Sequence, residues 1–432
     1  MFQLKLLSWN ARGLVHNLDQ LKNCLAYIED TPNVMAIQET HIPQAQEIDD
    51  PLLQIPGYTL VANKRADRKG GGTAFYIKNS IPYKIIDPFL ADIEYSEIQI
   101  MLEDCRTPLR LISIYLPPNK KIDEEKLTNL GLDRNTIMVG DFNAKSPIWG
   151  SSIRDVRGKA IERCLLDNTE LVCVNTGEPT HITAKGVQSH LDLTFCSSNL
   201  AIVTDWKVFK DNMGSDHYPT LTTVDKNIVA FPYIKSSWNI SKADWNDFTE
   251  YLNSKYPELG MLNFDRNRFS EFAKFIMSAA KDNIPVTSFN SEDPKRLRLP
   301  YWNKSCNDAI AQRKLAEKIM KKNRTFANIF KYQDAKSNVQ RILNEAKSLF
   351  WQAYVSTLSS DSKVGSVWRA IKTLSGKYSN RNIPIKALGN PILTDLDKAN
   401  IFAKEFSHVS SNDNLPPNYK EVRNNRLLPR IS

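Results

Sequence analysis

Short runs of strand-forming residues recur through the first 226 residues, and Gly, Pro, Asn and Asp separate them. Runs of this length are typical of strands, because an amphipathic helix needs a longer apolar pattern with a period of 3.6 residues. Helical spacing is clear at Leu18–Ile28, where Leu18, Leu21, Leu25 and Ile28 are apolar. Many short strands with few helices predict an α/β fold, a four-layered sandwich of two packed β-sheets flanked by helices. The expected strands are Leu4–Trp9, Val34–Gln38, Thr73–Ile77, Ile98–Leu102, Leu109–Tyr115, Thr136–Val139, Leu171–Val174, Leu191–Phe195 and Thr220–Val224.

The pattern changes after residue 226. Residues 227–237, with Pro232 and the run Ile234–Ser237, are expected to form a linker. Residues 238–410 are expected to be mostly α-helical, with helical periodicity over 238–283 and 301–356 and a second, polar linker over 284–299. The Asn- and Pro-rich residues 411–432 are expected to be a poorly ordered tail.

Charge is divided unevenly between these parts. The first 226 residues carry 24 Lys and Arg against 29 Asp and Glu, which leaves 33 basic and 19 acidic residues for the remainder. An acidic half can hold cations, and a basic half can contact a polyanion or form a solvated helical surface. The six cysteines include no CxxC pair, which argues against a zinc finger and favours reduced thiols in an intracellular protein. No run approaches the ~18 apolar residues of a membrane span, so no membrane partner is expected.

Polar residues end or follow several of the expected strands, or lie in loops beside them. Loops at strand ends, held by a rigid scaffold, are where sites are usually built. Each segment alone is more often a turn or a cap than a site. Their joint occurrence in one domain predicts a catalytic centre. The segments are Ser8-Trp9-Asn10, Gln38-Glu39-Thr40, Ile114-Tyr115-Leu116, Gly140-Asp141-Phe142-Asn143, Ser189-His190-Leu191-Asp192 and Ser215-Asp216-His217.

Taken in this order, the segments resemble the endonuclease/exonuclease/phosphatase family, which includes abasic-site endonucleases, DNases, inositol phosphatases and retrotransposon endonucleases. The resemblance covers about residues 3–226. Residues 8–14, 38–41, 70–74, 140–144 and 215–219 look most like the jockey-type non-LTR retrotransposons. Ser237-Trp238-Asn239 and the basic stretch around Trp302 resemble the region that precedes reverse transcriptase in such elements. The sequence contains neither Tyr-x-Asp-Asp nor Phe-Ala-Asp-Asp, so the polymerase core is expected to be missing.

The resemblance implies a role for each residue of the site. Glu39, Asn10 and Asp216 are implied to hold Mg²⁺, with Mn²⁺ as the alternative ion, because hard cations prefer oxygen ligands. Asp141 is implied to orient or deprotonate the attacking water. The other catalytic residues implied are Asn143, which fixes the water or a phosphate oxygen, His217, which donates to a phosphoryl oxygen, Asp192, which holds His217, and Tyr115, which donates to the phosphate.

One position departs from the family pattern. Some members carry an acidic residue two positions after the first Asn, where this chain has Arg12. A single Mg²⁺ held mainly by Glu39 is therefore favoured, and Arg12 is expected to contact a phosphate. The segment Thr180–Ser189 is interpreted either as a hairpin that enters a DNA groove or as an ordinary solvent loop. The nucleic-acid contacts expected are Arg12, Thr180, His181 and Lys185; His41 and His190 are given no role.

These residues together imply a magnesium-dependent DNA endonuclease that nicks a phosphodiester and leaves a 3′-OH for target-primed reverse transcription. The alternatives are an abasic-site or other phosphoesterase of the same family, or a decayed remnant that only binds nucleic acid. Expected partners are double-stranded DNA and element RNA, with no small-molecule cofactor and a nuclear location inferred from the substrate alone. The basic helical residues are expected either to contact nucleic acid or to belong to a solvated helix that packs on a neighbouring domain. These are Tyr301, Trp302, Arg313, Lys314, Lys318, Lys321, Lys322 and Arg324.

Overall fold

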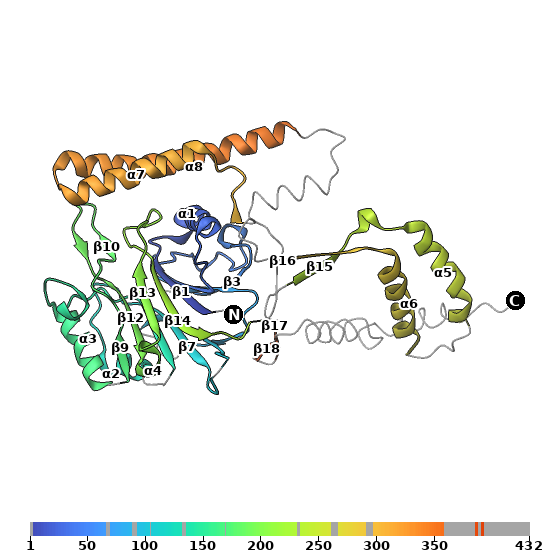
Figure 1. Ribbon diagram of the computed structural model, residues 1–432, viewed down its shortest axis with the longest axis horizontal. Helices are drawn as coiled ribbons and strands as arrows, with labels where there is room; N and C mark the ends of the chain where they lie inside the picture. The colour runs from blue at the N-terminus through green and yellow to red at the C-terminus, as the bar shows by residue number, and fades with distance from the viewer. Residues whose placement is uncertain are drawn as a thin grey trace, which may run out of the picture. The chain divides into compact units, whose positions relative to one another are not determined.

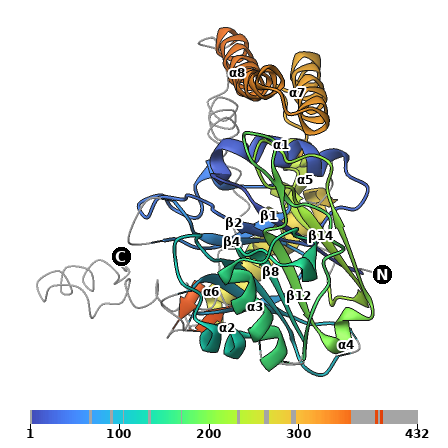
Figure 2. The same cartoon turned by 90° about the vertical axis from the view of Figure 1, so that its left-hand side faces the viewer.

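The computed structural model describes residues 3–65, 70–88, 93–103, 105–131, 135–168, 170–230, 234–260, 267–290, 297–357, 385–387 and 390–392. Two six-stranded sheets dominate the first 228 residues (Figures 1 and 2). The first has the order β13-β14-β1-β2-β4-β3 and the second the order β5-β6-β7-β8-β12-β9. The strands of the first sheet are β1 (Gln3–Asn10), β2 (Val34–Gln38), β3 (Tyr58–Asn63), β4 (Thr73–Lys78), β13 (Thr204–Val208) and β14 (Thr220–Asn227). Those of the second are β5 (Tyr83–Ile86), β6 (Glu94–Ile100), β7 (Leu109–Tyr115), β8 (Thr136–Asp141), β9 (Leu171–Cys173) and β12 (Asp192–Ser197).

Helices cover the outer faces of the two sheets, so the expected four-layered sandwich is confirmed. The central apolar cluster joins Leu4 and Leu6 of β1 to Leu109 and Leu111 of β7. Leu7 and Trp9 of the same strand belong to a second cluster, with α1 (Leu14–Tyr27), because the side chains of successive strand residues point to opposite faces. A third cluster lies between β7, β8, β12 and the helices α2 and α3. The helices of this domain are α1 (Leu14–Tyr27), α2 (Glu124–Leu130), α3 (Val156–Asp167) and α4 (Ser198–Ala201).

Two short strands form a separate hairpin that bears on the site. They are β10 (His181–Ile182) and β11 (Gln188–Ser189), paired antiparallel. Thr180–Ser189 therefore contains a hairpin, and its entry into a DNA groove stays a prediction. Three-residue 3-10 helices at Pro51–Leu53, Pro147–Trp149 and Ile240–Lys242 complete the short elements.

The region after residue 228 contains two helical pairs. The strands β15 (Ile234–Trp238) and β16 (Val286–Asn290) pair antiparallel and flank α5 (Trp245–Gly260) and α6 (Asn267–Asn283). The two segments expected to be linkers, 227–237 and 284–299, therefore each contain a strand. Each strand finds its hydrogen-bonding partner in the other segment, about 50 residues away in the sequence. Helices α7 (Lys304–Lys322) and α8 (Phe326–Ser356) lie side by side, and their buried cluster includes Cys306, Val339 and Leu343 (Figure 1).

A second compact unit comprises residues 379–432. Its described part is the hairpin of β17 (Ile385–Ala387) and β18 (Asn390–Ile392). The expected tail over 411–432 and the end of the expected helical region lie outside the described residues. Among the described helices, none combines the length and apolar character that crossing a membrane requires.

Candidate active site

The carboxyl ends of four strands meet at one edge of the sandwich. Strands β1 and β2 run parallel in the first sheet, and β7 and β8 run parallel in the second. Parallel neighbours end at the same edge, so Asn10, Glu39, Tyr115 and Asp141 are brought to one place. Gly140 makes this possible in β8, because a Cβ atom there would lie 1.9 Å from the carbonyl oxygen of Ile114 on β7.

Asn10 joins the two sheets at this edge. Its Nδ2 donates to Glu39 Oε1 and to Asp141 Oδ2, both at 2.9 Å. Asp141 Oδ2 also accepts from Asn143 Nδ2 at 2.9 Å, and Asp141 Oδ1 accepts from the backbone amide of Asn143 at 2.9 Å. The hydroxyl of Tyr115 is hydrogen-bonded to the Glu39 carboxylate. The predicted residues of β1, β2, β7 and β8 therefore form one continuous hydrogen-bonded network.

His217 and Asp192 form the opposite side of the site. His217 Nδ1 lies 2.8 Å from Asp192 Oδ2, and His217 Nε2 lies 3.9 Å from Asp141 Oδ2. The ring is buried, with 5% of the residue exposed, and the backbone carbonyl of His217 accepts from Trp9 Nε1. A carboxylate on Nδ1 orients the ring so that Nε2 is directed toward Asp141.

Thr180 fixes Asp192 in place. Its hydroxyl accepts from the backbone amides of Leu191 and Asp192 at 3.1 and 3.0 Å, and the residue is fully buried. The predicted contact of Thr180 with nucleic acid stays a prediction, and in this structure its hydroxyl is used within the protein. Lys185, at the tip of the β10–β11 hairpin, is exposed and remains free to face a ligand.

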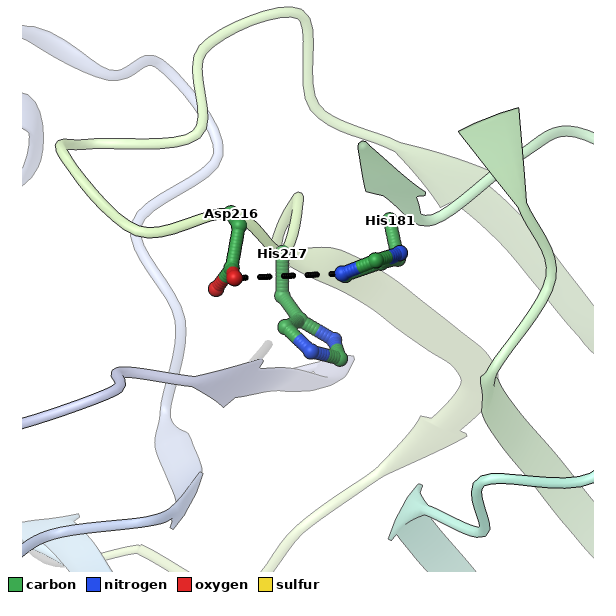
Figure 3. Close-up of side chains that lie close together, drawn as sticks. All are labelled: His181, Asp216 and His217. Atoms are coloured by element: carbon green, nitrogen blue, oxygen red, sulfur yellow. Dashed lines mark ion pairs between the residues drawn. The ribbon is translucent and has the colours of Figure 1, made fainter. Parts of the chain in front are cut away.

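His181 reaches the catalytic centre from the same hairpin (Figure 3). Its Nε2 lies 3.8 Å from Asp216 Oδ2, and its ring centre lies 4.6 Å from that of His217. Arg12, exposed at the mouth of the site, forms an ion pair with Asp216. Arg12, which stands where some family members have an acidic residue, thus neutralises Asp216. Asp216 is one of the residues predicted to hold the metal.

The electrostatics of the site follow from burial and close charges. Burial raises the pKa of Asp141 to about 7, with Asp192 and Glu39 adding to the rise and His217 opposing it. Burial lowers the pKa of His217, but Asp192 and Asp141 outweigh it and raise the pKa to about 10. Burial raises the pKa of Glu39, but hydrogen bonds from His41 and Asn10 bring it below its ordinary value. Asp216 is likewise held low, since His181, His217 and Arg12 outweigh its burial. His217 is therefore cationic at neutral pH, while Asp141 titrates near it.

The donor set fits a divalent cation. Asp141 has two further carboxylates close enough to raise its pKa, so the site carries negative charge that His217 alone does not offset. Glu39 presents carboxylate oxygen atoms of the kind that Mg²⁺ prefers. Asn10 presents Nδ2 to Glu39, and its Oδ1 accepts from the backbone amide of Arg12 at 3.1 Å. Within the described part of the chain, the ligand atoms of Asp141, Asp192 and His217, and separately those of His181, Asp216 and His217, lie within 4.8 Å of one another.

Backbone strain is concentrated at the site. Arg12, Glu39, His41 and Asn143 have φ values of 46°, 47°, 51° and 47°, in the left-handed region that non-glycine residues rarely adopt. Such strain, of order 1–3 kcal/mol at each residue, persists only where the surrounding structure enforces it. The hydrogen bonds described above supply that enforcement.

Sequence reasoning missed several supporting residues. Arg157 of α3 donates to the backbone carbonyls of Phe142, Asn143 and Leu116, which ties the Asp141–Asn143 loop to the end of β7. His41 was given no role, yet its Nε2 lies 3.1 Å from Glu39 Oε2. No local pattern marks Arg157, because its partners are distant in sequence. His190 lies outside the network, with Nε2 3.1 Å from the carbonyl oxygen of Gly177.

Comparison with known proteins agrees with this geometry. Residues 109–221, which carry Tyr115, Asp141, Asn143, Asp192 and His217, match the family described as "Endonuclease-reverse transcriptase". Over those residues the N-terminal domain is similar to this family. We call residues 3–228 the nuclease domain.

Curated relatives match beyond the nuclease domain. The chain is 23% identical over 415 residues to the "Probable RNA-directed DNA polymerase from transposon X-element" of Drosophila melanogaster, covering 94% of this chain and 44% of the relative. It is 25% identical over 421 residues to the "RNA-directed DNA polymerase from mobile element jockey" of Drosophila funebris, covering 93% of this chain and 43% of the relative. The chain therefore spans less than half the length of these relatives.

Two solved structures are similar to about half of this chain. The "Endonuclease domain of TRAS1, a telomere-specific non-LTR retrotransposon" is 21% identical with a TM-score of 0.44, covering 52% of this chain and 99% of that one. The "AP endonuclease LMAP from Leishmania major" is 17% identical with a TM-score of 0.44, covering 52% of this chain and 88% of that one.

Proposed function

We propose that this chain is a metal-dependent endonuclease that hydrolyses a DNA phosphodiester and leaves a 3′-OH. The observation that carries the proposal is the single network through which Asn10 connects Glu39 to Asp141, with the Asp192–His217 pair facing Asp141. A carboxylate that can take a proton and an imidazole that can donate one lie 3.9 Å apart at this edge, where one phosphate group can contact both.

Asp141 is proposed to take the proton of the attacking water. Its pKa of about 7 lies near the operating pH, where a general base is most effective. Asn10 and Asn143 both donate to Oδ2, so the carboxylate is held in one orientation. The water oxygen bonds to phosphorus, the bond to the 3′ oxygen breaks, and that oxygen takes up a proton.

His217 is proposed to donate from Nε2 to a phosphoryl oxygen. Asp192 keeps the ring charged at neutral pH, and the charge offsets the negative charge that develops on phosphorus during attack. Tyr115, hydrogen-bonded to Glu39, is placed to donate to the same phosphate.

Glu39 would hold one Mg²⁺, with Mn²⁺ as the alternative ion. Asn10 stays a predicted ligand, whose Oδ1 accepts from the backbone amide of Arg12 in this structure. When bound, the ion polarises the scissile phosphate. Asp216 is a weaker candidate ligand than Glu39, because Arg12 already neutralises it. Arg12 at the mouth is placed to contact a neighbouring phosphate once DNA displaces part of that pairing.

Double-stranded DNA is proposed as the substrate and target-primed reverse transcription as the process that uses the nick. The relatives named as RNA-directed DNA polymerases support this use, since a polymerase needs a 3′-OH primer. Contact with element RNA through the basic helices and a nuclear location stay predictions. Two of those helical residues contact the nuclease domain in this structure. Arg313 is buried, and Lys314 pairs with Asp211.

The test is nicking of supercoiled plasmid by the full chain, with Mg²⁺ and with EDTA. We expect open circles that require the metal and that disappear in Asp141→Asn and His217→Gln. Asp205→Asn, an exposed carboxylate of β13, is the matched control and should cut at the wild-type rate. No nicking by a folded wild-type chain in Mg²⁺ or Mn²⁺ would refute the proposal.

The alternatives give different results in the same assay. An abasic-site enzyme would cut a duplex oligonucleotide containing one abasic site far faster than the intact duplex. A decayed remnant would shift DNA in a gel without cutting either substrate. The proposal expects the intact duplex to be cut at a comparable rate.

A further inference from the structure

Helix α7 sends charged side chains into the nuclease domain. Arg313 is 1% exposed, and its guanidinium donates to Asn212 Oδ1 at 2.7 Å and to Asp211 Oδ1 at 2.5 Å. Asp211 and Asn212 lie in the loop that follows β13 and leads to Asp216 and His217. A buried guanidinium whose terminal nitrogens are paired in this way favours one relative position of the elements it joins, because losing the pairing leaves a buried charge.

One turn farther along α7, the helix contacts the residue after His217. The hydroxyl of Tyr218 donates to the carboxylate of Glu317, which is 4% exposed. Lys321 pairs with the same carboxylate at 2.8 Å and lies 4.3 Å from the centre of the Tyr218 ring. Helix α7 therefore contacts both the hydroxyl and the ring face of Tyr218.

The two histidines of the site are anchored in one apolar cluster. Ile182 follows His181, Tyr218 follows His217, and both pack with Met320 of α7 and Tyr332 of α8. Met320 and Ile182 are 0% and 1% exposed. Fixing Ile182 and Tyr218 therefore fixes the backbone from which each histidine ring extends.

Backbone hydrogen bonds tie the two segments to each other beneath this cluster. The amide of Ile182 donates to the carbonyl of Asp216 at 2.8 Å, and the amide of Tyr218 donates to the carbonyl of Thr180 at 2.7 Å. The hairpin tip also meets the end of α7, because a Cβ atom on Gly186 would lie 3.3 Å from carbons of Met320 and of Arg324, which follows the helix. From α8, Lys336 Nζ donates to the carbonyl of Ser215 at 3.4 Å.

We propose that α7, with Tyr332 of α8, is a positioning element of the nuclease that sets the placement of His181 and His217 at the scissile phosphate. Met320, Glu317 and Arg313 act through Tyr218, Ile182 and the Asp211–Asn212 turn and do not touch DNA. The part of the chain that follows the nuclease domain thereby controls its cutting rate. This inference rests on the proposed function for its catalytic consequence, but its structural consequence is independent of it.

The kinetic test uses the full chain with Met320→Ala, Met320→Leu and Leu315→Ala. Leu315 lies on the same helix and is 59% exposed, so it is the matched control. We expect kcat for plasmid nicking to fall about tenfold in Met320→Ala, since a displacement of the order of 1 Å can cost ~100-fold. KM for DNA should stay within twofold, Met320→Leu should restore most of kcat, and Leu315→Ala should match wild type.

Glu317→Gln is a second variant that preserves side-chain shape and therefore the fold. It weakens the hydrogen bond from Tyr218, and we expect kcat to fall about threefold with an unchanged KM. The proposal is overturned if Met320→Ala and Glu317→Gln both show a cooperative thermal unfolding transition and both keep the wild-type kcat.

A second readout does not depend on cutting. The sequence contains six histidines, so the ring signals of labelled chain can be followed individually by NMR. Met320→Ala should shift the ring signals of His181 and His217 and leave those of His41 and His190 in place. If wild type fails to cut DNA but these signals move, the proposed function fails and the positioning role survives. Unmoved signals would refute the positioning role whatever the activity.

Discussion

Replacing Asp192 by asparagine removes the carboxylate that keeps His217 charged. Asp192 is the largest contribution that raises the pKa of His217, from the ordinary 6.5 to about 10. Without it, burial acts to lower the pKa, and only Asp141 and Asp216 oppose it. If the pKa returns to 6.5, about one ring in four remains protonated at pH 7. The asparagine also lacks the charged oxygen that faces His217 Nδ1, so it no longer holds the His217 ring in one orientation.

Two measurements follow from this change. We expect kcat for plasmid nicking to fall ~100-fold or more, as for other losses of acid–base function. The alkaline limb of the pH–rate profile should move from about 10 to 7 or below, because the donor now loses its proton earlier. An NMR titration of the metal-free chain should show the same displacement in the His217 ring. An alkaline limb left near its original pH in Asp192→Asn would refute the assignment of His217 as the cationic donor.

The remaining predictions concern the metal, the pH and the backbone. Arg12→Asp releases Asp216 and adds an oxygen ligand, so calorimetric titration should show about tenfold tighter Mg²⁺ binding. The metal-free chain should lose stability as pH rises from 6.5 to about 10, because His217 keeps its proton in the folded state at pH values where the unfolded ring has lost it. The loss in the free energy of unfolding is at most ~5 kcal/mol. It is measured from the denaturant midpoint at each pH. Mg²⁺ at 100 times its Kd should add ~2.7 kcal/mol of stability at pH 8, measured as a rise in Tm. Gly140→Ala should destabilise the nuclease domain by ~3 kcal/mol, because the new Cβ meets the backbone of Ile114 and cannot move away from it.

The sandwich could be predicted because most of its strands are short, apolar and buried. The error at β6 has a physical cause. The strand was expected over Ile98–Leu102 but begins at Glu94, since Glu97 is buried through a two-point pairing with Arg110 on β7. A local pattern cannot distinguish such a paired charge from a solvent loop. Strands β3, β5 and β13 and helices α2 and α3 were not predicted, because only part of each element is buried.

The membership of the site could be predicted, but its pairings could not. The motif order in the sequence indicated Asn10, Glu39, Asp141, Asp192 and His217 as a set. The ion pair between Arg12 and Asp216 joins residues 204 positions apart, and the burial of Thr180 follows from amides on a different strand. Both depend on tertiary packing, which motif spacing does not encode. The same holds for the contacts between α7 and the His217 loop.

The most direct test of the account is the chemistry of the nick itself. Supercoiled plasmid treated with the full chain and Mg²⁺ is offered to a DNA polymerase with labelled nucleotides and no phosphatase treatment. The account predicts open circles that the polymerase extends at once, with label lost in EDTA and in Asp141→Asn. Intact plasmid after treatment with folded wild-type chain, or nicks that accept label only after phosphatase, would contradict the claim that this site hydrolyses DNA to a 3′-OH.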